Sequence, residues 1–409
     1  MNPEHDLPTT AADLEILHET VAALEDELIA FRRDLHAHPE LSGEEVRTTT
    51  IVAARLGAAG VRVRTLAGSG LVADIGPPDP AYRVALRADL DALPVAERTG
   101  LPFASQNHGM CHACGHDLHT AAVLGAGLAL QQHVDSLVAQ GTGVRLIFQP
   151  AEEVTPGGAL AVIEQGGIQG VDAIFTLHCD PTLDVGQVGL RDGPITAAAD
   201  TVTITLTGRG GHTSRPYLTQ DLVYALGKVV TDVPGALSRR VDPRAGVALV
   251  WGTVHSGNAD NVIPSTGTLS GTLRMLDAQL WEKIGPLFEE LVHAVISPYG
   301  VSARVEHVRG APPVVNDPDC VDILRRATGS ALGPEAAQPT PQSMGGEDFA
   351  WYLQRVPGAM GRLGTRTPGG PTYDLHQGDL IVDERAIASG AMLLAATALG
   401  GKYSQVADG

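Results

Sequence analysis

The stretch CHACGHDLHT, residues 111–120, places two cysteines, three histidines and an aspartate side by side. Thiolate, imidazole and carboxylate groups form a ligand set that divalent first-row metals accept. A structural zinc site is disfavoured because the chain has no second Cys-x-x-Cys pair, and the context of a thioredoxin-like redox pair is also missing. The cluster therefore predicts a catalytic or metal site whose other members lie elsewhere in the chain.

Three further segments each open with a short apolar run and close on acids or a histidine: RVALRADLDALP, VRLIFQPAEE and DAIFTLHCD. This pattern is typical of buried strands in an α/β sheet, and a helical pattern from Leu118 to Leu137 lies between the first two. Ligands of such sheets bind beyond the carboxyl ends of parallel strands. We therefore expect one crevice to collect the 111–116 cluster and the residues at the strand ends: Asp89, Glu152, Glu153 and His178.

These polar residues follow apolar strands, where buried charges need partners or a metal. Each one alone also has an ordinary explanation, such as a helix cap for Asp89 or a solvated acidic turn for Glu152 and Glu153. Cys114 and His116 are too close in sequence to surround one ion comfortably, whereas a thiolate or carboxylate can bridge ions roughly 3.5 to 4 Å apart. We therefore expect two metals, with one of the adjacent glutamates as a ligand and the other as a general base.

The order of patterns predicts an α/β protein with a mostly parallel sheet, interrupted by a smaller unit. Residues 14–35 carry an apolar stripe for a helix that ends before Pro39, and we expect this helix to pack on the sheet. From about Asp200 the patterns follow the order βαββαβ, which is typical of a compact two-layer α+β unit. The predicted boundaries are 13–195 and 311–409 for the catalytic domain and 196–310 for the inserted domain.

The chain of 409 residues has a formal net charge of −19, which repels phosphate backbones and anionic membrane surfaces. The first twenty residues lack the basic start and apolar core of a signal peptide, and no run approaches about 18 apolar residues. Four cysteines are too few for a disulfide framework in a chain of this length. We therefore expect a cytoplasmic protein that acts on a small molecule, with no nucleic-acid or membrane partner.

Taken together, the motifs resemble the amidohydrolase branch of the dimetal aminoacylase and carboxypeptidase family of metallopeptidases. This branch contains hippurate hydrolases, N-acyl amino acid deacylases and hydrolases of indole-acetic acid conjugates. The matching stretches follow one another through nearly the whole chain: RRDLHAHPELSGEE, VALRADLDALPV, HACGHDLHT, LIFQPAEE, GRGGHTS, NVIPSTGTLSGTLR, MGGEDF and the pair Leu375–His376. The resemblance implies a metal-dependent hydrolase of the amide bond in N-acyl amino acids or related amines, and a homodimer formed through the inserted domain, which would also act as a lid.

The resemblance also implies residue roles. Five residues would ligate two divalent ions, for which zinc, manganese, cobalt and nickel are all suitable: Cys114, His116, Glu153, His178 and His376. Glu152 would be the general base, and Asp89 falls at the active-site aspartate, with Arg87 at the position where the wider family has a metal-binding histidine. In the inserted domain, the histidine that polarises the scissile carbonyl, often from the other subunit, matches His212. Asn261 and Arg274 match positions that hold polar groups of the substrate, although a surface salt bridge explains Arg274 equally well.

Two departures from the branch affect the site. Cys111 replaces a common methionine, and the second histidine that is usual near Tyr217, after GGHTS, is missing. Two alternative functions stay open at this point: a dipeptidase or aminopeptidase of the same family, and a non-catalytic metal or thiol sensor that uses Cys111 and Cys114. The sensor leaves Glu152 and His212 without a role.

Overall fold

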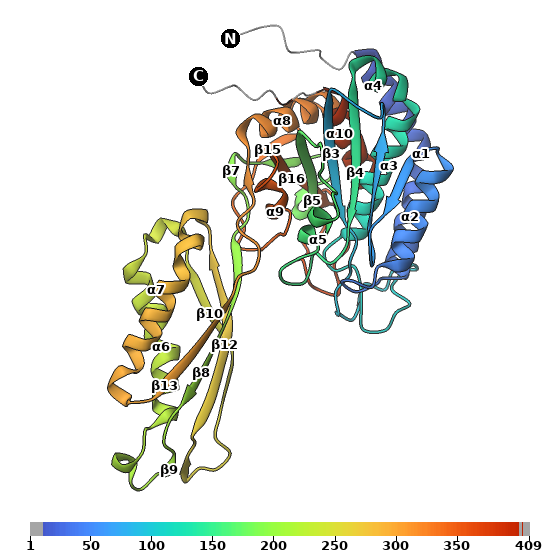
Figure 1. The fold of residues 1–409 in the computed structure, drawn as a ribbon. Coiled ribbons are helices and arrows are strands. Elements are labelled where there is room, and N and C mark those ends of the chain that lie inside the picture. Colours follow the sequence, from blue (N-terminus) through green and yellow to red (C-terminus); the bar gives the residue numbers. More distant parts are fainter. Residues whose placement is uncertain (1–10, 401–402, 404–409) are drawn as a thin grey trace, which may run out of the picture. The chain divides into compact units, whose positions relative to one another are not determined.

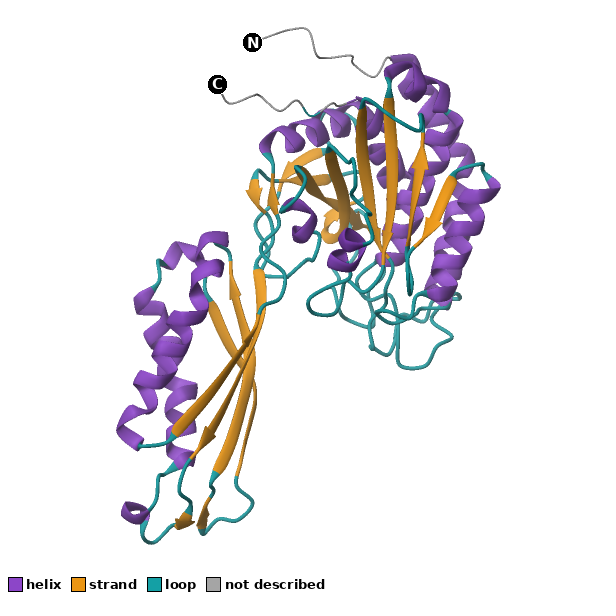
Figure 2. Ribbon diagram, in the orientation of Figure 1, coloured by secondary structure: helices purple, strands orange, loops and turns teal. Residues whose placement is uncertain are grey.

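The computed structural model describes residues 11–400 and residue 403. Backbone contacts divide the chain into two compact units, which Figures 1 and 2 show as ribbons. The first unit contains the described residues up to Ile195, residues 315–341 and those from Trp351 on, and the second contains Thr196–Val314 and Gln342–Ala350. The second unit thus interrupts the first, and residues 342–350 group with it, although the sequence assigns them to the second part of the catalytic domain. Residues 1–10, 401–402 and 404–409 lie outside the described part. The expectation about a signal peptide in the first twenty residues and the predicted domain end at 409 fall partly on them.

An eight-stranded sheet forms the centre of the first unit, in the order β1-β2-β4-β3-β5-β16-β6-β15. Its strands are β1 Arg62–Thr65, β2 Leu71–Ile75, β3 Tyr82–Asp89, β4 Thr142–Gln149, β5 Ala173–Asp184, β6 Val188–Leu190, β15 Ala337–Pro339 and β16 Gly358–Arg366. The central strands β4, β3, β5 and β16 run parallel, as do β6 and β15, whereas β1, β2 and the β16–β6 pair run antiparallel to their neighbours. The predicted α/β class with a mostly parallel sheet is confirmed. A separate ribbon pairs β7 Gly193–Pro194 with β14 Val315–Asn316.

Helices cover this sheet: α1 Ala11–Ala37, α2 Val46–Ala58, α3 His116–Gln132, α4 Val134–Gln140, α5 Ala159–Glu164, α8 Pro318–Leu332 and α10 Arg385–Gly400; the short α9 Ala350–Leu353 starts at the boundary of the units. Every residue of α3 from 116 to 130 is buried, which fits its lack of a polar face, because α3 lies between the central strands and α1. The expected packing of α1 on the sheet is wrong, since α1 packs against α3 and α10 instead. None of the described helices is long and apolar enough to cross a membrane.

The register of the parallel strands brings the polar strand ends together. Asp89, the last residue of β3, lies opposite Gln149, the last residue of β4, so that Pro150 to Glu153 leave the sheet directly beside Asp89. On the other side of β3, Arg87 lies opposite Thr176 of β5, and His178 follows two residues later. All eight residues of β4 are buried, which anchors the turn that follows it. The predicted meeting of the strand ends at one edge is therefore observed.

The second unit has the predicted order of elements, with β8 Ala198–Thr207, α6 Leu222–Arg240, β10 Ala248–Ser256, β12 Thr266–Met275, α7 Ala278–Ile296 and β13 Ser302–Val308. Its four strands form an antiparallel sheet in the order β10-β12-β8-β13. Alternate residues of β8 are buried, and the two helices pack against each other and against the sheet, which gives two layers. Two short strands that the sequence patterns do not reveal, β9 Gly211–His212 and β11 Val262–Ile263, form a small ribbon.

Candidate metal centre

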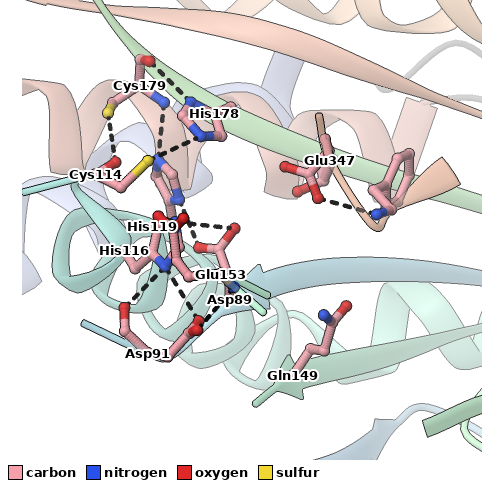
Figure 3. Close-up of polar contacts among 12 residues, drawn as sticks. Asp89, Asp91, Cys114, His116, His119, Gln149, Glu153, His178, Cys179 and Glu347 are labelled. Atoms are coloured by element: carbon pink, nitrogen blue, oxygen red, sulfur yellow. Dashed lines mark hydrogen bonds and ion pairs between the residues drawn. The ribbon is translucent and has the colours of Figure 1, made fainter. Parts of the chain in front are cut away.

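The start of α3 holds the first two predicted ligands. Cys114 and His116 flank Gly115, which has a φ of 78°, a backbone conformation that side chains other than that of glycine rarely adopt. A Cβ atom at Gly115 would also lie 2.6 Å from the Sγ atom of Cys179 on β5. Gly115 therefore lets the helix start approach β5 closely, so that the Cys114 Sγ atom lies 3.6 Å from Nε2 of His178 (Figure 3).

The structure brings all five predicted metal ligands together. Potential ligand atoms lie within 4.8 Å of one another in one group of Cys114, His116 and His178 and in a second group of Cys114, Glu153 and His376. The groups overlap at Cys114, which is the arrangement expected when one thiolate serves two ions. His376 has a left-handed backbone with a φ of 62°, which the structure accepts at this position although it is not a glycine.

The chemistry of these side chains fits a metal. His116 Nε2 is buried and has no hydrogen-bond partner among the described residues, although Glu153 Oε1 lies 3.7 Å away. Burial and the acids around it, Glu153 foremost, raise the pKa of the Cys114 thiol well above its usual value. Burial opposes the charged form of His116, but Asp89, Asp91 and Glu153 outweigh it and raise its pKa to about 10. The site thus concentrates negative charge, which a divalent cation would compensate.

Two hydrogen bonds fix the histidine tautomers that metal binding requires. His178 Nδ1 donates to the carbonyl oxygen of Cys179 at 2.9 Å, and His116 Nδ1 donates to the carbonyl oxygen of Asp91 at 2.9 Å. In His178 the proton on Nδ1 leaves the lone pair of Nε2 for a metal, whereas in His116, whose raised pKa favours the imidazolium form, a metal would replace the proton on Nε2. Burial and the neighbouring His119 lower the pKa of His178 well below its usual value, so this ring is neutral.

Asp91 contacts residues of the site without being a predicted ligand, and the sequence patterns assign it no role. Its Oδ2 atom accepts hydrogen bonds from the backbone N–H of Glu153 at 2.9 Å and from Ser42 Oγ at 2.6 Å, and its Oδ1 lies 3.3 Å from Nδ1 of His116. Asp91 thereby contacts two of the predicted ligands at once. Asp91 follows Asp89 by two residues in RADLDALP, and residues two positions apart in an extended segment lie on the same side. This spacing is the sequence signal that could have placed Asp91 near Asp89.

Asp89 lies beside the ligands but is held by other residues. Its Oδ1 accepts from His119 Nδ1 at 2.7 Å and its Oδ2 accepts from Arg87 at 2.7 Å. The backbone N–H of Cys179 donates to His119 Nε2 at 2.8 Å, which makes this nitrogen an acceptor and places the ring proton on Nδ1. Burial opposes ionisation of Asp89, but His116, His119 and Arg87 hold its pKa well below the usual value. Asp89 is therefore a buried carboxylate that His119 orients. His119 belongs to the stretch 111–120, but the sequence patterns assign it no role.

Glu152 and Glu153 follow each other in the turn after β4. Potential ligand atoms of Glu152, Glu153 and His116 lie within 4.8 Å of one another, so the predicted base lies next to the predicted ligands. Contact with Glu153, whose Oε1 is 3.2 Å from His376 Nε2, raises the pKa of His376 against the effect of burial. A single acidic turn thus carries both the expected general base and an expected ligand.

The remaining predicted residues belong to the second unit. His212 lies on β9, where its Nδ1 accepts a hydrogen bond from the backbone N–H of Ser214 at 3.1 Å. Asn261 precedes β11, and its carbonyl oxygen accepts from the backbone N–H of Thr213 at 3.2 Å. Arg274, at the end of β12, donates to the carbonyl oxygen of Met344 at 2.7 Å. Within this unit His212 and Asn261 are neighbours on one ribbon, and the roles of all three stay predictions.

The two departures noted in the sequence have different surroundings. Cys111 is buried, and burial raises the pKa of its thiol to about 11. A buried thiol that stays protonated is a poor redox sensor. Tyr217 is 80% exposed in the second unit and contributes to no core. The structure therefore gives no support to a thiol sensor built on Cys111.

Comparisons with known proteins show what the chain is similar to. The sequence model of Peptidase family M20/M25/M40 matches residues 85–400. A Rhodococcus jostii protein that bears the name of a glutamate–cysteine ligase is 48% identical over 91% of this chain, although the chain spans only 46% of that protein. The N-acetyl-L-cysteine deacetylase of Bacillus subtilis is 37% identical over 94% of this chain and 92% of its own length. The crystal structure of a dinuclear metal-binding peptidase of the M20 family, also from Bacillus subtilis, matches with a TM-score of 0.81 and 33% identity over 92% of this chain and 98% of the other.

Proposed function

This chain belongs to the Peptidase family M20/M25/M40 and is a hydrolase of amide bonds, and from that premise we propose that it removes the acyl group from N-acyl amino acids or related N-acyl amines. The observation that carries the proposal is the pair of ligand groups that share Cys114, next to a second, adjacent glutamate. A deacetylase among the relatives that match over nearly the full chain supports the substrate class.

Five residues would hold two divalent metal ions: Cys114, His116, Glu153, His178 and His376. The ligand set is compatible with zinc, manganese, cobalt or nickel. When bound, such ions polarise a carbonyl group and lower the pKa of a water molecule towards about 7.

Glu152 would move the proton in this reaction. As the carboxylate next to the ligands, it takes a proton from the attacking water while the water oxygen bonds to the amide carbon. When the C–N bond breaks, Glu152 returns that proton to the departing nitrogen, and the products are a carboxylic acid and an amine. Asp89, held by Arg87 and His119, stays ionised beside the site and keeps the surrounding charge negative.

The second unit would contribute to substrate binding. His212 is the proposed donor to the oxyanion, with Asn261 as its neighbour on the ribbon, and Arg274 is the proposed partner of the substrate carboxylate, because a guanidinium group pairs with a carboxylate through two parallel hydrogen bonds. The replacement Arg274→Ala should raise the KM for N-acyl amino acids and leave the KM for their methyl esters unchanged. An equal change for both substrates would remove Arg274 from this role.

We also propose a homodimer formed through the second unit, and a cytoplasmic location. Among the residues that the structure describes, β10 lies at the edge of its sheet, and it exposes Val250 and Val254, which a second copy would cover. The four cysteines of the chain are free thiols, which is usual in a reducing compartment. Light scattering of the purified protein and fractionation of cells would test the two statements, and a monomer at micromolar concentration would contradict the first.

Two adjacent glutamates allow a matched test of the mechanism. Glu152→Gln should keep both metal ions and the fold but lose turnover by at least about 10²-fold, since it removes the general base. Glu153→Gln should lose bound metal as well as activity, because Glu153 is a ligand. Amine release from N-acyl amino acids and metal content would be measured for both variants, with a free dipeptide as a second substrate. Substantial activity in Glu152→Gln would rule out its role as the base, and faster cleavage of the dipeptide would favour a peptidase.

A further inference from the structure

The turn that carries Glu152 is fixed on both sides of this residue. Ala151, before it, has a left-handed backbone with a φ of 55°, and its carbonyl oxygen accepts from the N–H of Gly158 at 2.8 Å. A Cβ atom at Gly158 would lie 1.9 Å from the carbonyl oxygen of Pro150, so this closure depends on glycine. Glu153, after it, is held by Asp91 through its backbone N–H. Glu152 therefore extends from a short backbone segment with anchors at either end.

Glu45 holds the backbone of Ala151, the residue before Glu152. This glutamate is fully buried, with 0% exposure, and lies 106 positions before Ala151 in the sequence. Its Oε1 atom accepts from the backbone N–H of Ala151 at 2.8 Å and from the backbone N–H of Gly43 at 2.8 Å, and its Oε2 accepts from Ser69 Oγ at 2.6 Å. Three donors thus converge on one buried carboxylate, which leaves it little freedom to move.

A purely structural role as a helix cap does not account for Glu45. It stands at the N-cap position of α2, but its side chain makes no capping hydrogen bond. Glu40 provides the cap instead, with Oε1 and Oε2 accepting from the backbone N–H groups of Arg47 at 2.8 Å and Thr48 at 2.7 Å. The Glu45 side chain thus binds the turn that carries Glu152, and not the helix that Glu45 precedes.

The loop before α2 reaches the same turn a second time. Ser42 Oγ donates to Asp91, which in turn accepts from Glu153. Residues 42 and 45 therefore hold the turn through separate contacts, one at Ala151 and one through Asp91 at Glu153. The left-handed conformation of Ala151 is unfavourable for an alanine, so the turn needs such contacts to keep it.

We propose that Glu45 is a positioning residue for the general base: its carboxylate holds the Ala151 N–H and thereby fixes the direction in which the Glu152 side chain leaves the backbone. This inference rests on the proposed role of Glu152. A carboxylate that is misplaced by about 1 Å loses about 10²-fold in rate even though it is still present. Glu153 keeps its own anchor at Asp91, so metal binding should not depend on Glu45.

Kinetics of three variants test the proposal. Glu45→Ala should lower kcat by about 10²-fold, with a KM within about 3-fold of wild type and with both metal ions retained. Glu45→Gln should recover most of this loss, because its amide oxygen can accept from Ala151 and Gly43 while its NH₂ group donates to Ser69. Glu40→Ala is the control, since it removes a partly buried helix cap from the same loop, whose side-chain hydrogen bonds within the described part of the chain are with α2 and not with the turn, and its kcat should stay within about 3-fold of wild type.

A double-mutant cycle separates positioning from general damage. If Glu45 acts through Glu152, then adding Glu45→Ala to Glu152→Gln should reduce the residual kcat by less than about 3-fold, because the group that it positions is already gone. A further 10²-fold loss in that background would overturn the proposal, as would a Gln variant that is as slow as the Ala variant. Should Glu45→Ala fail to fold, Glu45→Asp keeps the charge but shortens the reach by one methylene, and it should show the same loss of kcat.

Hydrogen exchange tests the contact without using activity. Within the 150–154 segment, the amide hydrogen of Ala151 should lose protection in Glu45→Ala and keep it in Glu40→Ala, which should instead lose protection at the start of α2. Unchanged protection of the 150–154 segment in Glu45→Ala would contradict the contact itself. If the contact is confirmed but the wild-type protein releases no amine from any N-acyl amino acid, the proposed function fails and the anchoring of the turn stands.

Discussion

Removing the carboxylate of Asp91 tests how the residues behind the ligands support the metal centre. The replacement Asp91→Ala deletes the acceptor for Ser42 Oγ at 2.6 Å and for the Glu153 N–H at 2.9 Å. Each hydrogen bond to a charged acceptor contributes about 1.5 to 3 kcal/mol, so the metal-free protein should lose about 3 to 6 kcal/mol in free energy of unfolding. The His116 tautomer should survive, because its Nδ1 still donates to the backbone carbonyl of residue 91.

The same replacement should weaken metal binding moderately. Loss of a group that orients metal ligands typically lowers affinity by about 10- to 100-fold, or about 1.4 to 2.7 kcal/mol. Since the carbonyl contact to His116 remains, we expect a value near the lower end. Titration with a chromophoric chelator would measure the affinity, and urea denaturation of the metal-free protein would measure the stability.

Ser42→Ala provides the control for this prediction. It removes one donor to Asp91 but leaves the contacts of Asp91 with Glu153 and His116 in place. Its metal affinity should stay within about threefold of wild type. If Asp91→Ala binds metal as tightly as wild type, the reasoning that Asp91 orients the ligands is refuted.

Two further predictions concern the buried charges next to the site. Asp117 has 0% exposure, forms an ion pair with Arg32, whose Nε lies 2.6 Å from its Oδ2, and accepts a hydrogen bond from His36 Nδ1 at 2.8 Å. Asp117→Ala should therefore lower the free energy of unfolding by about 3 to 5 kcal/mol in urea denaturation, and a loss below about 1 kcal/mol would contradict this account. Burial opposes the ionisation of Glu97, but hydrogen bonds from His36, Thr99 and the Ser105 N–H lower its pKa from 4.5 to about 2. Because the folded-state pKa is depressed, Glu97 stabilises the protein above about pH 4.5 and loses this contribution as the pH falls towards 2. The difference in stability between wild type and Glu97→Gln should therefore shrink over that pH range, and a constant difference would contradict the assignment.

Much of the site could be predicted from the sequence because apolar runs that end in polar residues mark the ends of strands. Apolar runs that end in Asp89, Glu152 and His178 indicate parallel strands, and the parallel register alone brings those residues to one edge. The carboxylates that hold the turn are harder to find. Glu45 contacts Ala151 across 106 residues, and neither residue belongs to a periodic pattern that would place the two together.

The differences from the sequence expectations have the same origin. The apolar stripe of α1 shows that the helix is buried on one face, but a stripe does not distinguish a sheet from other helices as its partner, and here α3 and α10 take that place. Residues 342–350 follow a segment of the first unit in sequence, yet the side chain of Gln342 donates to the carbonyl oxygens of Thr196 and Leu276 in the second unit. Such contacts depend on tertiary structure, which local patterns do not encode.

The central claim is that a dimetal centre built on Cys114 hydrolyses the amide bond of N-acyl amino acids. The most direct measurement is elemental analysis of the purified protein, combined with amine release from a panel of N-acyl amino acids before and after treatment with a chelator. The account predicts two metal equivalents per chain and amine release that stops with the chelator and returns when metal is added. A protein that binds no metal after reconstitution, or one that holds both ions and releases no amine from any member of the panel, would contradict it.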